Sequence, residues 1–107
     1  MRNKPHISIP KEDIDIFCKS HFIINLALFG SVLTDQFTET SDVDVLVEFA
    51  PGHIPGLFGI IDMEEELTNI VGRKADLRTP KDLSRYFRED VIKQAYPLYG
   101  QGQFRSN

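Results

Sequence analysis

The chain has 107 residues, of which 41% are hydrophobic and 26% charged, and its formal net charge is −4. This length and composition predict one globular domain with a single modest core. The acidic balance argues against a general phosphate-backbone surface, so we expect no direct nucleic-acid binding. Cys18 is the only cysteine, which excludes a disulfide within the chain and a thiolate metal cluster. Without a long apolar run or a signal-peptide profile, we expect a cytoplasmic protein that does not contact a membrane.

Helical and strand-like patterns alternate along the chain. The expected elements, in chain order, are a helix over 11–21, strands over 23–29 and 42–49, a helix over 57–71, a short strand over 74–78, a turn or short helix within 79–87, and a helix over 89–96. Pro97 should disrupt the last helix, and residues from about 100 to 107 should form a flexible tail. The alternation predicts an α/β fold for 1–107, with a small mixed β-sheet of at least three strands covered mainly by helices.

Gly30 and Ser31 stand between the first strand and a short helical segment. Glycine permits a tight turn and a close approach of ligand to backbone, and Ser31 adds a hydroxyl donor at the start of the helical segment. Exposed N–H groups at such a position suit an anionic phosphate. Taken alone, however, a Gly-Ser turn before a helix is more often only a turn or an N-cap.

Asp42 and Asp44 open the second predicted strand. Because strand side chains alternate, the two carboxylates share one face about 6.5–7 Å apart along the chain. Carboxylates so placed can hold one hard cation or bridge two, and Mg²⁺ commonly combines one or two carboxylates with substrate phosphates. The alternative is that Asp42 caps a turn while Asp44 faces water. The Gly-Ser turn ten residues upstream favours the metal site.

Asp76 lies between Ala75 and Leu77 in the short strand over 74–78. A charge in the middle of such a strand needs a partner, a metal or solvent. Beside Asp42 and Asp44 it could complete a metal site and orient or deprotonate an attacking hydroxyl. Otherwise it is an ordinary charge on an edge strand.

Together these motifs resemble the minimal nucleotidyltransferases of the DNA polymerase β-like superfamily. The resemblance extends over nearly the whole chain, through Phe29-Gly30-Ser31, the segments 41–47 and 72–77, and the closing 95–99. It implies the minimal nucleotidyltransferase fold, with Asp42, Asp44 and Asp76 as catalytic ligands of Mg²⁺, two ions in all. Gly30 and Ser31 would hold the triphosphate of the substrate ATP. An acceptor hydroxyl would displace pyrophosphate from the α-phosphorus.

The chain departs from this family at Val32. Many relatives have an arginine soon after Gly-Ser, whereas this chain continues with Val32, Leu33, Thr34 and Asp35. If that arginine contacts phosphate, then Arg73, Lys74 or Arg78 could replace it. Weaker triphosphate binding, or binding that depends on a partner, is the other interpretation.

The size of the chain is similar to that of antitoxins in two-component toxin–antitoxin systems. That resemblance implies a HEPN-type ribonuclease toxin as partner, in a hetero-oligomer, and transfer of AMP from ATP to a hydroxyl of the toxin, a tyrosine. The added phosphate would repel RNA and inactivate the toxin. Two alternatives stay open: an antitoxin that acts by binding alone, and a nucleotidyltransferase with a small-molecule acceptor.

Overall fold

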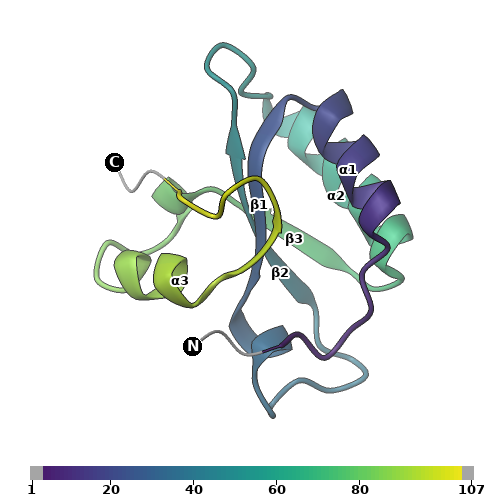
Figure 1. The fold of residues 1–107 in the computed structure, drawn as a ribbon, viewed down its shortest axis with the longest axis vertical. Coiled ribbons are helices and arrows are strands. Elements are labelled where there is room, and N and C mark those ends of the chain that lie inside the picture. The colour runs from purple at the N-terminus through teal and green to yellow at the C-terminus, as the bar shows by residue number, and fades with distance from the viewer. Residues whose placement is uncertain (1–3, 105–107) are drawn as a thin grey trace.

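The structure is a computed structural model that describes residues 4–104. These residues form helices α1 (Lys11–Ser20), α2 (Leu57–Val71) and α3 (Arg88–Gln94), strands β1 (Ile23–Phe29), β2 (Val43–Phe49), β3 (Ala75–Arg78) and β4 (Tyr96–Tyr99), and short 3₁₀ helices η1 (Gly30–Leu33) and η2 (Pro80–Asp82). The strands lie in the order β3-β2-β1-β4 in one sheet. Strand β1 runs antiparallel to β2 and β4, while β2 and β3 are parallel, so the expected mixed α/β sheet is confirmed (Figure 1).

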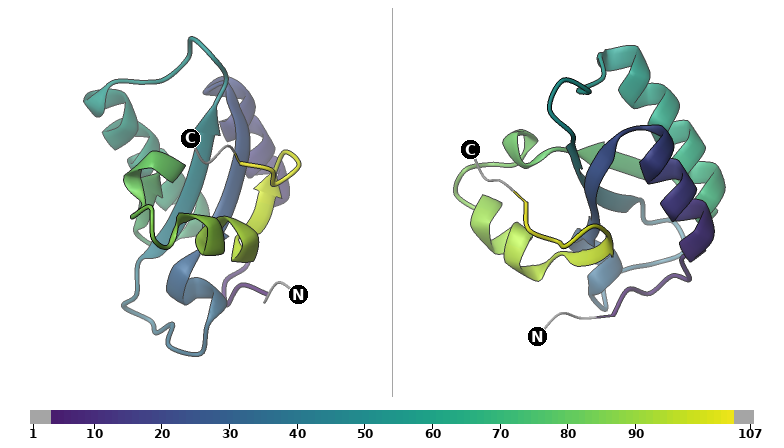
Figure 2. Two further views of the ribbon diagram at one scale, coloured as in Figure 1. Left: turned by 90° about the vertical axis from the view of Figure 1, so that its left-hand side faces the viewer. Right: turned by 45° about the horizontal axis from the view of Figure 1, so that its top comes forward.

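Strand β2 alternates between the two faces of the sheet, as the sequence predicts. Its odd-numbered residues, Val43 to Phe49, join the main core, which packs under α1 and α2. Leu46 belongs instead to a smaller cluster with Ala27, Ala95 and Phe104 on the other face, where α3 and the C-terminal segment lie (Figures 1 and 2). Asp44 and Glu48 therefore share the second face with Leu46.

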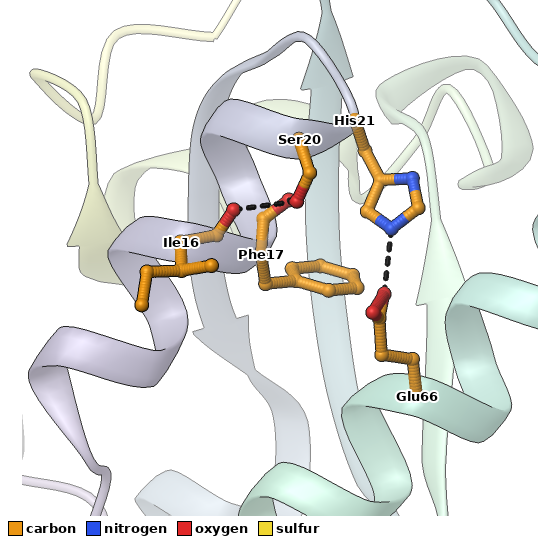
Figure 3. A network of polar contacts seen from close by, with 5 residues as sticks. All are labelled: Ile16, Phe17, Ser20, His21 and Glu66. Carbon is orange, nitrogen blue, oxygen red and sulfur yellow. Dashed lines mark hydrogen bonds and ion pairs between the residues drawn. The ribbon is translucent and has the colours of Figure 1, made fainter.

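Helices α1 and α2 pack side by side and are linked by a polar contact at the end of α1. His21 lies 2.6 Å from Glu66 of α2, through its Nε2 and a carboxylate oxygen, and stacks at an angle on Phe17 (Figure 3). Ser20 Oγ, in the last turn of α1, donates to the carbonyl oxygen of Ile16 at 2.6 Å. Cys18 is buried in this core, and burial raises the pKa of its thiol to about 12, so the thiol is inert.

Strand β3 is an edge strand whose outer N–H groups are covered by α2. Thr68 Oγ1 accepts from the Ala75 N–H at 3.0 Å, and Glu64 Oε2 accepts from the Leu77 N–H at 2.7 Å. Gly72 ends α2 in the left-handed region, as predicted, with φ of 78°. These contacts hold β3, and with it Asp76, in a defined position beside β2.

The C-terminal part of the chain contains a strand that was not expected. Residues 96–99 form a fourth strand, although Pro97 was expected only to disrupt a helix; β4 lies at the edge of the sheet, where proline is tolerated. The turn or short helix expected within 79–87 is confirmed by η2 at Pro80–Asp82, and the helix expected over 89–96 is confirmed by α3, which ends two residues earlier, at Gln94.

The flexible tail expected from residue 100 is also wrong for residues 100–104. Asn25, which is 7% exposed, accepts from the Gly102 N–H at 3.1 Å and donates to the Gln103 carbonyl at 3.2 Å. Phe104 is buried against Leu46 and Ala95. Residues 105–107 lie outside the described part of the chain.

Across residues 4–104, every helix is too short or too polar to span a bilayer.

Candidate active site

Gly30 and Asp44 touch where β1 passes into η1. Phe29 is the register partner of Asp44 across the β1–β2 ladder, so the turn at Gly30 falls beside this carboxylate. Gly30 has φ of 78°, and a Cβ placed on it would lie 2.6 Å from Asp44 Oδ2. Both the left-handed backbone and the lack of space require glycine here. The predicted small-residue turn and the predicted carboxylate are thus brought together.

Asp44 and Asp76 are direct partners in the parallel ladder of β2 and β3. Both point to the face that carries α3, because their strand neighbours Val43, Val45, Ala75 and Leu77 all belong to the core on the opposite face. Two carboxylates from different strands are therefore adjacent on one face of the sheet. Such a pair can share a hard cation between them.

The surroundings of Asp44 disfavour its negative charge. Its pKa is raised, first by burial and then by Asp76, while Arg78 lowers it and Asp42 adds a smaller raising effect. Like charges held close together are costly unless a cation neutralises them. This cluster is therefore suited to bind a metal ion or another positive group.

Asp42 lies just before β2, and its carboxylate is close to Lys74. Its Oδ2 is 3.9 Å from Lys74 Nζ, and the two side chains are 44% and 70% exposed. Within residues 4–104, no three Asp, Glu, His or Cys side chains are grouped closely enough to form a metal site by themselves. The structure brings Asp44 and Asp76 together and leaves Asp42 beside them with a lysine.

The side chains of Asp42, Asp44 and Asp76 nevertheless have the chemistry that Mg²⁺ requires. All the donors are carboxylate oxygens, the ligands that this hard cation prefers, and Mg²⁺ with a nucleotide needs only one or two carboxylates besides phosphates and water. The glycine at position 30 keeps Asp44 Oδ2 uncovered by a Cβ on that side. Asp42, Asp44 and Asp76 are thus suitable residues to hold it, and their catalytic roles remain a prediction.

Ser31 and Val32 occupy η1 with different surroundings. The Ser31 carbonyl accepts from both the N–H and the hydroxyl of Thr34, at 2.9 and 3.0 Å, which fixes the short helix after Gly30. Val32 is fully buried in the main core. The position after Gly30-Ser31 is therefore a packing position in this chain, and any cation for the phosphates must come from elsewhere.

The three basic residues considered as replacements have different environments. Arg73 places its guanidinium 4.4 Å from the centre of the Phe37 ring and donates to the Thr38 carbonyl, so it holds the loop before β2. The ammonium group of Lys74 lies 3.9 Å from a carboxylate oxygen of Asp42. Arg78 is two residues beyond Asp76 on the same strand and pairs in register with Leu46.

Phe104 packs in one cluster with Leu46, Ala27 and Ala95 on the face of the sheet that carries Asp44, and sequence reasoning missed it. The available signal was a single aromatic residue after two glycines, Gly100 and Gly102, in an otherwise polar segment. Both glycines have positive φ, and neither has room for a Cβ.

Comparisons with known proteins agree with this arrangement. A family model described as a nucleotidyltransferase domain matches residues 11–99. Protein adenylyltransferase MntA of Thermococcus cleftensis is 33% identical over 69 residues, which are 64% of this chain and 68% of the relative.

Solved structures share the fold. A crystal structure of a toxin–antitoxin with AMP-PNP superposes with a TM-score of 0.69 at 19% identity, over 87% of this chain and 75% of that one. A complex of a tri-AMPylated Shewanella oneidensis HEPN toxin with an MNT antitoxin gives 0.61 at 18% identity, over 85% and 70% of the two chains. At these identities the structures establish the fold alone. The family model, which matches residues 11–99, shows that the chain belongs to the nucleotidyltransferase domain family.

Proposed function

We propose that this chain is a Mg²⁺-dependent protein adenylyltransferase and an antitoxin. In this proposal it transfers AMP from ATP to a tyrosine hydroxyl of a HEPN-type ribonuclease toxin, with which it forms a cytoplasmic hetero-oligomer. The observation that carries the proposal is the meeting of Gly30, Asp44 and Asp76 on one face of the sheet. Support for the acceptor comes from relatives: one is a protein adenylyltransferase, and one structural neighbour is a complex with an AMPylated HEPN toxin.

The reaction joins the acceptor oxygen to the α-phosphorus of ATP and breaks the bond from that phosphorus to the oxygen bridging to the β-phosphate. Pyrophosphate leaves, and the hydroxyl proton passes to the Asp76 carboxylate or to solvent. Mg²⁺ bound by Asp42, Asp44 and Asp76 would supply positive charge to the phosphates and to the entering and leaving oxygens. The protein residues mainly position the reactants. The Gly30 turn would receive the triphosphate, and Asp76, on the other side of Asp44, would lie near the acceptor hydroxyl.

The product explains why the toxin would lose activity. A tyrosine that carries AMP has gained a negative phosphodiester and a bulky nucleoside. Ribonucleases must approach the phosphate backbone of RNA, so the added charge repels their substrate and the nucleoside blocks access.

Labelled ATP tests this proposal. The purified chain is incubated with Mg²⁺ and the folded product of the neighbouring gene, using ATP labelled at either the α- or the γ-phosphate. We expect the partner to acquire the α-label only, and Asp42→Asn with Asp44→Asn to abolish labelling. Neutralisation of the toxin by that unlabelled double variant would favour binding alone, and label on a small molecule from cell extract would favour the other acceptor.

A further inference from the structure

We propose that Lys74 binds the β- and γ-phosphates of the nucleotide and so does the work of the arginine that this chain lacks after Gly30-Ser31. The inference rests on the proposed use of ATP, and it adds a specific phosphate ligand to that site. It concerns the side chain of Lys74 and requires no movement of the sheet.

The backbone fixes Lys74 at the first carboxylate of the site. The Lys74 carbonyl accepts from the Val43 N–H at 2.8 Å, which ties the residue to the start of β2, directly after Asp42. Its Nζ reaches to within 3.9 Å of Asp42 Oδ2. Both side chains border one open hollow, whose lining residues are Glu39, Thr40, Ser41, Asp42, Gly72, Arg73 and Lys74.

The ion pair between Lys74 and Asp42 is loose. A separation of 3.9 Å exceeds hydrogen-bond length, and both side chains are largely open to solvent, so little stabilisation is lost when the pair separates. Lysine has a flexible stem and three donors, which lets it move from a carboxylate to phosphate oxygens nearby. With Asp42 engaged in holding a metal ion, the Lys74 ammonium group would be available to bind the phosphates.

The other two basic candidates are less suited to this role. Arg73 is already engaged with Phe37 and the Thr38 carbonyl. Arg78 lies past Asp76, four positions along the chain from Lys74, and its guanidinium donates to the Leu77 carbonyl at 3.1 Å. Of these three basic side chains, only that of Lys74 lies beside Asp42.

Calorimetric titration of the purified chain alone tests the assignment. The probes are Mg²⁺ with α,β-methylene-ATP, whose α–β bridge cannot be cleaved, and Mg²⁺ with AMP, which lacks the two outer phosphates. For Lys74→Gln we expect about tenfold weaker binding of the ATP analogue, about 1.4 kcal/mol, because charge-assisted hydrogen bonds are lost. AMP binding should change less than about twofold, and Lys74→Arg should restore most of the loss.

Lys81→Gln is the matched control, because Lys81 is exposed in η2 and borders a different hollow with Val47 and Phe49. It removes the same charge and should leave both affinities unchanged. Equal weakening of both ligands by Lys74→Gln, or a loss of the same size with Lys81→Gln, would overturn the assignment and indicate a general field effect. Unchanged binding of the ATP analogue would overturn it outright, as would a wild type that binds no nucleotide. If binding depends on Lys74 but no AMP reaches a partner, the assignment stands and the proposed transfer fails.

Discussion

Gly30 and Asp44 lie so close together that a Cβ on Gly30 would be 2.6 Å from Asp44 Oδ2. The contact joins the turn proposed for the triphosphate to a carboxylate proposed for the metal. Gly30→Ala should therefore displace Asp44, and a ligand shift of about 1 Å can cost about a hundredfold in rate. We expect transfer to fall by about that factor, measured with α-labelled ATP and the partner.

Gly52→Ala controls for backbone strain in this experiment. Gly52 has φ of 82°, much like Gly30, but no atom lies within 4 Å of its would-be Cβ. We expect Gly52→Ala to lower the free energy of unfolding by about 1 kcal/mol and to leave the rate of AMP transfer unchanged. Equal losses of activity in the two variants would show that strain alone, without contact with Asp44, explains the effect.

Asp44→Asn should stabilise the protein near neutral pH while it abolishes transfer. The pKa of Asp44 is raised in the folded protein, chiefly by burial and next by Asp76, so the ionised carboxylate disfavours the folded state above the pKa of the unfolded chain. Because solvent around this half-buried group weakens the effect, we expect a small rise in Tm for the variant.

The difference in stability between Asp44→Asn and the wild type should depend on pH. As pH falls through the raised pKa of Asp44, the wild-type carboxyl becomes neutral, like the amide, so the stability difference should shrink toward zero. Thermal melts of both proteins across this range, without metal, provide the measurement. A variant that is less stable at pH 7, or a difference that does not depend on pH, contradicts the proposed electrostatic cost.

Asn25 should be essential for the packing of residues 100–104. It donates to Glu48 at 2.9 Å, besides its bonds to Gly102 and Gln103, and it is 7% exposed. Asn25→Leu would remove the hydrogen-bond partner of the Gly102 N–H and of the Gln103 carbonyl, at a cost of about 2 kcal/mol in the free energy of unfolding measured with urea. Proteolysis should also become faster within 100–104, whereas Asn69→Leu on the exposed side of α2 should change stability by less than about 0.5 kcal/mol. Loss of stability without faster cleavage there would rule out this role.

Local patterns were sufficient to predict the elements in the first half of the fold and the face of the sheet on which Asp44 lies. Alternation along 42–49 correctly separated the core valines from the face that carries Asp44, because a strand buried on one side must repeat every two residues. Gly72 was correctly expected to end α2, since its left-handed conformation is a local property.

Long-range pairing could not be predicted in the same way. The register of Asp44 with Asp76 depends on how α2 returns the chain to the sheet, which no short motif encodes. Strand β4 was missed because Pro97 indicates a break, although an edge strand accepts it. The bonds from Asn25 to residues 102 and 103 cross more than 75 positions, so a polar, glycine-containing segment was wrongly expected to be flexible.

Asp42, Asp44 and Asp76 are proposed to act together in the transfer of AMP to a protein. The most direct test of this transfer is the intact mass of the neighbouring gene's product after incubation with this chain, ATP and Mg²⁺. We predict a mass increase in whole units of AMP with the wild type, and none with Asp76→Asn, although that variant should still bind the nucleotide. An unchanged mass for a partner verified as folded and toxic, with wild-type protein that binds ATP, would contradict the account.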